Sequence, residues 1–328
     1  MVANYSPLVL LVMLIDQIPL APPSAPRRGR PQVYSERLFL KALVIMVLRH
    51  LPSVHALVAV LDQPTPEMQQ LRALLSEDSR YPSRRTFERR LAAIPDTLPA
   101  QIACLGQHLL TLIQPWSDCG RAVAIDSTVV RAFAGAVWHK RDREAGRVPH
   151  SAIDTEAHWT KSDYHGWVYG WKLHLVTTVA AVWIPLAAEV TPANAADNVQ
   201  ATRLLPDLPA EARFILGDTH YGDTALCQDA AGRGHTLIAP SQGGVRPRTD
   251  AGAAIRSLFH ALRSHAIENF NGQFKAIFDV NRPVPTRGLL ATRRLLLGAV
   301  FVYQLAVLHR QQVGEPLRVG LKPFLQAA

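Results

Sequence analysis

Cysteine is scarce in this sequence of 328 residues. Only Cys104, Cys119 and Cys227 are present, and no two of them form a Cys-x-x-Cys pair. An odd number of widely spaced cysteines argues against a disulfide framework and against a cysteine-based zinc site. We therefore expect a protein of a reducing compartment, and we place it in the cytoplasm.

The first hydrophobic run of the chain is short. Residues 8–15 are apolar, but Asp16 ends the run and no basic region precedes it. A run of this length is too short to cross a bilayer and lacks the layout of a secretory signal. We interpret it as a helix that faces the protein core, and we expect no association with a membrane. No internal repeat is visible.

Acidic residues are outnumbered by basic ones. The 35 Lys and Arg against 26 Asp and Glu give a formal net charge of +9 and an isoelectric point near 9.8. This balance indicates an anionic partner, either nucleic acid or an acidic membrane surface. Most of the basic residues are Arg, whose planar guanidinium favours two-point contacts with phosphate. The alternative is that the arginine content reflects a GC-rich genome.

The first third of the sequence predicts helices. A Pro-rich basic linker follows the first helix at residues 21–30, and Ser35, Ser53 and Ser83 stand where a side chain can cap a helix. The further predicted helices are residues 36–49, 54–62, 66–75, 84–94 and 99–113, with a break at Pro115. We assign residues 1–117 to an all-α N-terminal region.

One of these predicted helices has a basic face. Phe87, Leu91 and Ile94 share one side of it, while Arg85 and Arg89 point to the opposite side. This layout is typical of a helix docked on a small bundle with its basic face toward DNA, as in a helix-turn-helix. The alternative is a solvated charged face on a structural helix. We expect the N-terminal region to serve DNA binding or dimerisation.

From Arg121 the pattern changes from helices to strands. Strands are predicted at residues 121–126, 171–181, 184–190, 212–218 and 236–239, and helices at 197–205, 224–231 and 254–275. The order β-β-β-α-β-α-β-α predicts an α/β domain with a mixed sheet over residues 118–280. A polar insert is expected near residues 134–170. Residues 281–328 predict a helical tail, amphipathic over 288–308, that packs on the core.

Three acids occupy matching places in this predicted topology. Asp126 and Asp218 each end a predicted strand, and Glu268 lies in the last predicted helix of the domain. Burying an acid there is costly unless a cation or hydrogen bonds compensate it. Three converging carboxylates suit two Mg²⁺ ions, with Asp126 bridging both, Asp218 holding one and Glu268 the other. Taken alone, each Asp is more often a turn or cap residue.

Several basic residues stand close to these acids in the predicted fold. Lys275 lies seven residues after Glu268, about two helical turns, so both occupy one helix face. Lys172 and His174 are two apart on a strand and face the same side, and Lys172 is the better candidate for DNA because its charge does not depend on pH. Arg246 and Arg248 follow a Gly-Gly pair and suit backbone contacts with DNA.

Five motifs in order carry a family resemblance. They are Ala124-Ile-Asp126-Ser-Thr128, Tyr169-Gly-Trp-Lys172-Leu-His174, Thr191-Pro-Ala-Asn194-Ala-Ala-Asp197, Gly217-Asp218-Thr-His-Tyr221 and Ile267-Glu268-Asn-Phe-Asn-Gly-Gln-Phe-Lys275. With them the sequence resembles bacterial insertion-sequence transposases of the DDE type, in the broad group that includes the IS4 and IS5 families. The short interval between Asp218 and Glu268 favours the compact, IS5-like arrangement.

The resemblance implies a fold, a chemistry and partners. It implies a ribonuclease H-like catalytic core in which Asp126, Asp218 and Glu268 bind Mg²⁺, with Mn²⁺ expected to substitute. The implied activity is cleavage at the ends of an element, followed by attack of the freed 3′-hydroxyl on target DNA. Double-stranded DNA would be the partner, a homodimer would pair two DNA ends, and the protein would be associated with the nucleoid.

The sequence departs from the family pattern next to two of the acids. Related proteins usually read Asp-Lys-Gly-Tyr after the second acid, whereas Thr219 and His220 stand here. An Arg is common three or four residues before the Glu, where this chain has His265 and Ser264, with Arg263 one step further out. Two alternatives stay open: a metal-dependent nuclease without strand transfer, and a decayed transposase that only binds DNA.

Overall fold

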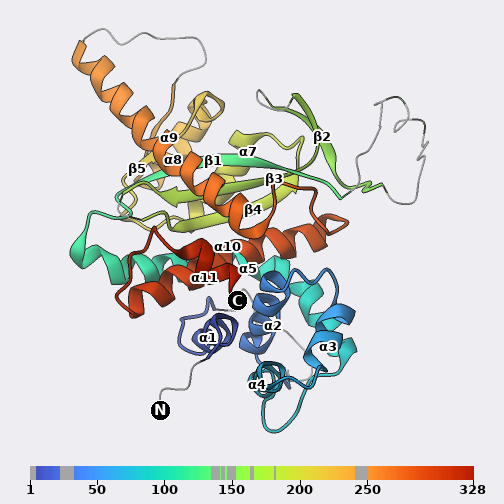
Figure 1. Ribbon diagram of the computed structural model, residues 1–328. Coiled ribbons are helices and arrows are strands. Elements are labelled where there is room, and N and C mark those ends of the chain that lie inside the picture. The colour runs from blue at the N-terminus through green and yellow to red at the C-terminus, as the bar shows by residue number, and fades with distance from the viewer. Residues whose placement is uncertain are drawn as a thin grey trace.

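The computed structural model describes residues 5–22, 33–133, 141, 145, 153–162, 166–180, 182–240 and 250–328 (Figure 1). Its first helices are α1 (Pro7–Leu14), α2 (Glu36–Leu48), α3 (Val54–Leu61), α4 (Pro66–Leu74) and α5 (Arg84–Ile113). The predicted caps are confirmed, since Ser35, Ser53 and Ser83 each accept a hydrogen bond from the backbone N–H three residues on. Such a bond satisfies one of the free donors that every helix N-terminus exposes.

Helix α5 is longer than its sequence predicts. The predicted end at residue 94 is wrong, because one helix continues through Pro95 and Pro99 to Ile113. A proline inside a helix costs about 3 kcal/mol, since it lacks the N–H donor and crowds the preceding turn. A single apolar stripe offsets that cost: Phe87, Leu91, Ile94, Leu98, Ile102, Leu105 and Leu109 recur at helical spacing and are all buried. The stripe packs mainly on α10 and β4.

The strands form one mixed sheet. They are β1 (Ala122–Arg131), β2 (His158–Ser162), β3 (Gly166–Thr178), β4 (Pro185–Pro192), β5 (Phe214–Leu216) and β6 (Thr236–Ile238). The order is β2-β3-β1-β5-β6, and β4 also pairs with β3. Strand β3 runs antiparallel to β1, β2 and β4, whereas β1, β5 and β6 run parallel. Strands β2 and β4 share one edge of β3, because β2 pairs with 166–170 and β4 with 171–177.

Two predictions about the sheet need correction. The insert predicted as a polar connection contains β2, so the order becomes β-β-β-β-α-β-α-β-α; most of residues 134–152 lie outside the described residues. Strand β1 does not end at Asp126 but continues to Arg131, because residues 127–131 pair with residues 170–174 in the middle of β3. Asp126 therefore lies inside a strand rather than at its end.

The remaining helices pack on the sheet, except α11, which contacts α1, α9 and α10. They are α7 (Asp197–Leu204), α8 (Thr224–Gly232), α9 (Asp250–Phe278), α10 (Leu289–Gln312) and α11 (Leu321–Gln326), with short 3-10 turns η1 (Gln114–Trp116), η2 (Leu205–Asp207) and η3 (Thr219–Tyr221). In Figure 1, α5 and α10 lie beneath the sheet, α1 to α4 lie below them, and α9 crosses the sheet with its first half projecting outward. The division at residues 117/118 and 280/281 stays a prediction.

Helix α10 is a core helix. The sequence predicted an amphipathic tail over 288–308, but α10 is buried on all sides from Leu296 to Leu308 and contacts α1, α2, α5 and β4. Among the described helices it alone is long and apolar enough to cross a membrane, and the same composition suits its buried position here. The N-terminal helices and the sheet belong to one continuous hydrophobic cluster because α10 and α5 lie between them.

Glycine 106 sets how closely α5 approaches β4. A Cβ at Gly106 would lie 2.7 Å from the carbonyl oxygen of Pro185, whereas a Cβ at Gly272 in α9 would meet no atom within 4 Å. We expect Gly106→Ala to lower the free energy of unfolding by about 1–3 kcal/mol through overpacking. Gly272→Ala should raise it by ~0.5–1 kcal/mol, as in an open helical position. Urea unfolding measures both, and equal midpoints for the two variants contradict this packing.

Candidate active site

Asp126 and Asp218 lie where two parallel strands separate. The pairing of β1 with β5 ends at the pair Ala124 and Leu216, and each Asp lies two residues further along its own strand direction. Asp218 keeps an extended backbone, with φ −87° and ψ −169°. Extended residues alternate between faces with a period of two, so both carboxylates leave on the same side. The sheet thus brings the two acids together as predicted, although Asp126 lies inside β1 rather than at its end.

Arg263 of α9 lies between the two carboxylates. One guanidinium nitrogen, Nη2, is 3.7 Å from Oδ1 of Asp126 and 3.5 Å from Oδ2 of Asp218. Its side chain is 12% exposed, and its Nε is buried without a hydrogen-bond partner in the described part of the chain. Both distances exceed those of ordinary hydrogen bonds, about 2.7–3.2 Å. Arg263 therefore neutralises the two acids electrostatically without bonding tightly to either.

The electrostatic environment of Asp126 disfavours its charged form. Burial raises the pKa of its carboxyl to about 6, while Arg263 and a hydrogen bond from the Ser127 backbone N–H oppose this rise. The neighbouring carboxylates of Asp218 and Asp197 raise the pKa further. The two carboxylates of Asp126 and Asp218 thus share the single positive charge of Arg263, which does not balance both of them. Hard divalent cations prefer such carboxylate oxygens, so the residues fit a metal ion.

Glu268 lies on a different side of α9 from Arg263. Five residues of helix turn the two side chains roughly 140° apart. Glu268 is exposed, and within the described residues no three His, Cys, Asp or Glu side chains come close enough to hold a metal ion. The structure thus brings two of the three predicted acids together.

Lys275 shares the helix face of Glu268 and reaches toward the sheet. Its side chain is half-buried, and burial lowers the pKa of its ammonium group while the carboxylate of Asp126 opposes that shift. Lys275 is therefore within electrostatic reach of Asp126. Its contact with DNA phosphate stays a prediction.

The turn after Asp218 contains the unusual Thr219-His220 pair. Oδ1 of Asp218 accepts a hydrogen bond from the His220 backbone N–H at 2.8 Å and lies 3.3 Å from His220 Nδ1, so Asp218 caps η3. Tyr221 is buried, and its pKa is raised by burial and by Asp126, Asp197 and Asp218. A Cβ at Gly217 would lie 2.8 Å from Cβ of Tyr221, so this close packing requires glycine.

Lys172 is held by protein rather than presented to solvent. Its Nζ donates to both carboxylate oxygens of Asp197, at 2.9 and 3.0 Å, and to the Ala195 carbonyl at 3.2 Å. In the β1–β3 register Asp126 is opposite Leu175 and Ser127 is opposite His174, so Lys172 and His174 leave from the reverse face of the sheet. Lys172 was predicted to contact DNA; in this structure it anchors the first turn of α7 to β3.

His174 completes this buried group. Its Nε2 is 2.8 Å from the hydroxyl of Thr191, and its Nδ1 is 3.5 Å from Oδ1 of Asp197. Sequence reasoning quoted Asp197 in a motif but gave it no role. A signal was present in the sequence, because Asp197 is the first residue of a predicted helix and follows two consecutive predicted strands, the first of which carries Lys172 and His174.

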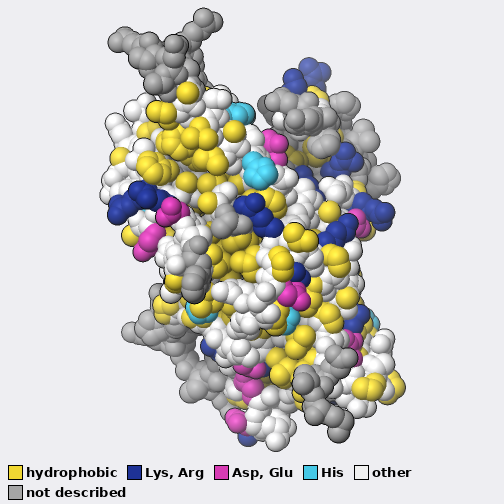
Figure 2. Space-filling view, turned by 60° about the vertical axis from the view of Figure 1, so that its left-hand side comes forward, with side chains coloured by type: hydrophobic (Ala, Val, Ile, Leu, Met, Phe, Trp, Pro, Cys, Tyr) yellow, Lys and Arg dark blue, Asp and Glu magenta, His cyan; other side chains and the backbone are white. Residues whose placement is uncertain are grey.

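Two further residues predicted to bind DNA lie on α5, an element that carries none of the three acids. Arg85 and Arg89 are exposed on α5, opposite the buried Phe87 and Leu91, as predicted. Arg246 and Arg248 lie outside the described residues. Figure 2 shows that Lys and Arg side chains form separate groups on the face it displays, rather than one continuous patch.

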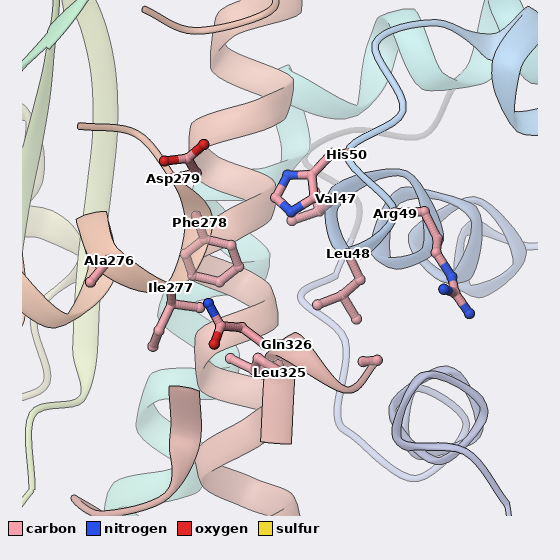
Figure 3. A pocket seen from close by; sticks show the side chains of 11 residues that line it. Val47, Leu48, Arg49, His50, Ala276, Ile277, Phe278, Asp279, Leu325 and Gln326 are labelled. Atoms are coloured by element: carbon pink, nitrogen blue, oxygen red, sulfur yellow. The ribbon is translucent and has the colours of Figure 1, made fainter. Parts of the chain in front are cut away.

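A pocket of about 430 Å³ lies at the C-terminal end of α9. It is lined by the ends of α2, α9 and α11, with His50 and Asp279 on facing walls (Figure 3). Both residues have a positive φ, 51° and 52°, because each follows the last turn of a helix in the left-handed conformation. The pocket is separate from the two aspartates and takes no part in the candidate site.

Comparison with known proteins identifies the family. Residues 117–305, more than half of the chain, match the model of the transposase DDE domain. The chain belongs to this family. The matched span contains Asp126, Asp218 and Glu268, and the chain is thereby a transposase-type enzyme of a family that typically uses a divalent metal ion. No curated protein matches the sequence.

Two solved transposase structures are similar at a low level. The piggyBac transposase synaptic complex with hairpin DNA has a TM-score of 0.40 and 10% identity, covering 99% of this chain and 79% of that one. The Mos1 transposase paired-end complex with the left transposon end has a TM-score of 0.23 and 12% identity, covering 87% of this chain and 81% of that one. Family membership rests on residues 117–305 alone.

Acid should destabilise the transposase through His174. Burial lowers the pKa of this imidazole to about 4, with Asp197 opposing and Lys172 adding to the shift. The unfolded chain, with a His pKa near 6.5, takes up the proton first as the pH falls. His174 should therefore cost stability progressively between pH 6.5 and 4, on the order of 3 kcal/mol in total.

Urea unfolding of His174→Gln at several pH values checks this expectation. The variant should lose less stability than the wild type between pH 7 and 4, whatever its stability at pH 7. His220→Gln, at a position whose side chain is 65% exposed, serves as the control and should keep the wild-type slope. Parallel curves for His174→Gln and the wild type refute the prediction.

Proposed function

We propose that the protein is a DDE transposase that cleaves phosphodiester bonds at the ends of its insertion element and joins the 3′-hydroxyl to target DNA. One observation carries the proposal: Asp126 and Asp218 converge where β1 and β5 separate, facing the cations of α9. The family match supports the transposase class. Strand transfer by two-metal in-line transesterification is the mechanism that this arrangement suits.

We propose a ribonuclease H-like core for the sheet. Five strands in the order β4-β3-β1-β5-β6 support it, with the second strand antiparallel to its neighbours and the last three parallel. Strand β2 is an addition on the free part of the β3 edge. In such a sheet the acids belong at the point where parallel strands diverge, which is where Asp126 and Asp218 lie.

Mg²⁺ is the proposed cofactor, with Mn²⁺ as its substitute. Asp126 and Asp218 would hold it, and Glu268 would join from α9 by turning its exposed carboxylate toward them. When bound, the metal supplies charge neutralisation and an activated oxygen nucleophile for the phosphodiester. The protein orients its ligands beforehand, since backbone N–H groups of Ser127 and His220 donate to Asp126 and Asp218.

Double-stranded DNA is the proposed partner. The net charge of +9 supports it, and Lys275 and Arg263, both within electrostatic reach of Asp126, would contact the phosphates next to the scissile bond. Arg85 and Arg89 would contact DNA from α5, and Arg246 and Arg248 from the segment before α9. Phosphate contacts of this kind fix the position of the duplex without reading its sequence.

We also propose that two copies pair on DNA. Ile255, Leu258 and Leu262 are exposed on the first half of α9, at the spacing i, i+3, i+7 of a helix-pairing seam. Figure 2 shows an apolar area on the upper part of the molecule, where α9 projects in Figure 1. We further propose that the protein is encoded by a bacterial insertion sequence of the IS4 or IS5 group. It would act in the cytoplasm, at the nucleoid.

One assay separates the transposase from its two alternatives. The protein is incubated with Mg²⁺, a labelled duplex from the inverted repeats that flank its gene, and a target plasmid. Cleavage with joining supports the transposase, cleavage alone supports a nuclease, and a gel shift without either supports a decayed DNA-binding protein. EDTA should abolish both reactions while the gel shift persists.

The acids themselves are tested by isosteric changes. Asp126→Asn, Asp218→Asn and Glu268→Gln should each lower the cleavage rate by roughly 10³-fold or more, about 4 kcal/mol of transition-state stabilisation, while DNA binding remains. Asp279→Asn at the exposed end of α9 is the matched control and should cleave like the wild type. Unchanged cleavage by any of the first three variants removes that residue from the site.

A further inference from the structure

We propose that Arg263 couples metal binding to DNA binding by exchanging partners. In the free protein its guanidinium neutralises Asp126 and Asp218; on the complex it moves to a DNA phosphate and leaves both carboxylates to the divalent cation. This inference rests on the proposed function and adds that DNA binding favours metal binding. Arg263 is then a positioning residue for the metal ligands.

The geometry of Arg263 is that of a replaceable counter-ion. A well-formed Arg–carboxylate pair has two parallel N–H···O bonds of about 2.7–2.9 Å. Here one nitrogen is shared between two carboxylates at 3.5 and 3.7 Å, and neither contact is a hydrogen bond. Two acids therefore share a single positive charge. The contact compensates part of their repulsion and leaves each of them incompletely satisfied.

The buried Nε of Arg263 points to a missing partner. It has no acceptor among the described residues, although the side chain is only 12% exposed. A buried N–H donor without an acceptor is costly, so a group that supplies one is favoured. A phosphate offers several acceptor oxygens and matches the planar fork of a guanidinium. A DNA phosphate would therefore supply the acceptor that Nε lacks among the described residues.

Metal and guanidinium compete for the same oxygens. Arg263 contacts Oδ1 of Asp126 and Oδ2 of Asp218, two of the oxygens that would bind the metal ion. A divalent cation placed there would lie within a few ångströms of the guanidinium, and like charges repel strongly in a partly buried site. The free protein is thus expected to bind metal weakly. DNA relieves the competition because its phosphate attracts Arg263 away.

Thermodynamic linkage makes this coupling reciprocal. If DNA raises the affinity for the metal by some factor, the metal raises the affinity for DNA by the same factor. The fixed position of α9 allows the exchange without a large rearrangement. Phe270 and Phe274, which follow Arg263 on the same face, are fully buried, so only the side chain of Arg263 needs to move.

The coupling is measured with Mn²⁺ as the probe. Mn²⁺ affinity is determined by electron paramagnetic resonance for the full-length protein, alone and saturated with a phosphorothioate duplex that resists cleavage. For the wild type, DNA should raise the Mn²⁺ affinity by roughly tenfold or more. Arg263→Gln should bind Mn²⁺ roughly tenfold more tightly than the wild type without DNA, and DNA should then add little.

Two further variants make the outcome decisive. Arg233→Gln removes a cation that pairs with Asp229 in α8, at 3.1 Å, and should keep the wild-type coupling. Arg263→Lys keeps the charge and should retain part of the coupling, which covers the case in which Arg263→Gln does not fold. Equal or weaker Mn²⁺ binding by Arg263→Gln without DNA overturns the exchange, even if the wild type cleaves DNA. Mn²⁺ binding that survives Asp126→Asn overturns the metal site, and the exchange with it.

Discussion

Two carboxylates held close together where β1 and β5 separate are the constraint on which this molecule depends. Parallel pairing brings Asp126 and Asp218 to one place, and it ends two residues earlier, which opens the space that they share. The turn after Asp218 is fixed by its own cap and by Tyr221 packed against Gly217. Two neighbouring carboxylates repel each other unless a positive charge compensates them. That requirement is met by Arg263 of α9, with Lys275 in support.

The position of α9 depends in turn on the core. Phe270 stacks on Phe274 at 5.7 Å and meets Tyr303 of α10 edge-on at 5.1 Å. The hydroxyl of Tyr303 donates to Gln273 at 3.0 Å, so polar and aromatic contacts fix the same helix turn. Aromatic pairs of this kind add to the free energy gained by burying their area. Helix α10 is itself buried between the N-terminal helices and the sheet, which makes the whole hydrophobic core the support of the two basic residues.

Local signals in the sequence predicted local structure well. Ser35, Ser53 and Ser83 cap their helices because a side-chain oxygen next to free N–H groups needs no tertiary partner. Features that depend on distant packing were mispredicted. Two helices were predicted at residues 84–94 and 99–113, yet the apolar stripe of α5 runs through Pro95 and Pro99 as one helix. Helix α10 was expected to expose one face, yet partners cover it on all sides. The prediction that Asp126 ends a strand was wrong, because pairing with β3 extends β1 to Arg131 and that pairing is not visible in the sequence of β1 alone.

The same distinction holds for the charges of the site. Motifs located the acids, because an acid after an apolar strand is visible in one segment. Counter-ions were not predictable, since they depend on which face of the sheet and which side of a helix each side chain takes. Lys172 follows the motif pattern of a DNA contact but lies behind the sheet with Asp197, while Arg263, outside the usual family position, reaches both acids. The net charge of +9 therefore overstates the number of basic residues that are free to bind a phosphate backbone. Lys172 and Arg263 instead neutralise acids of the protein itself.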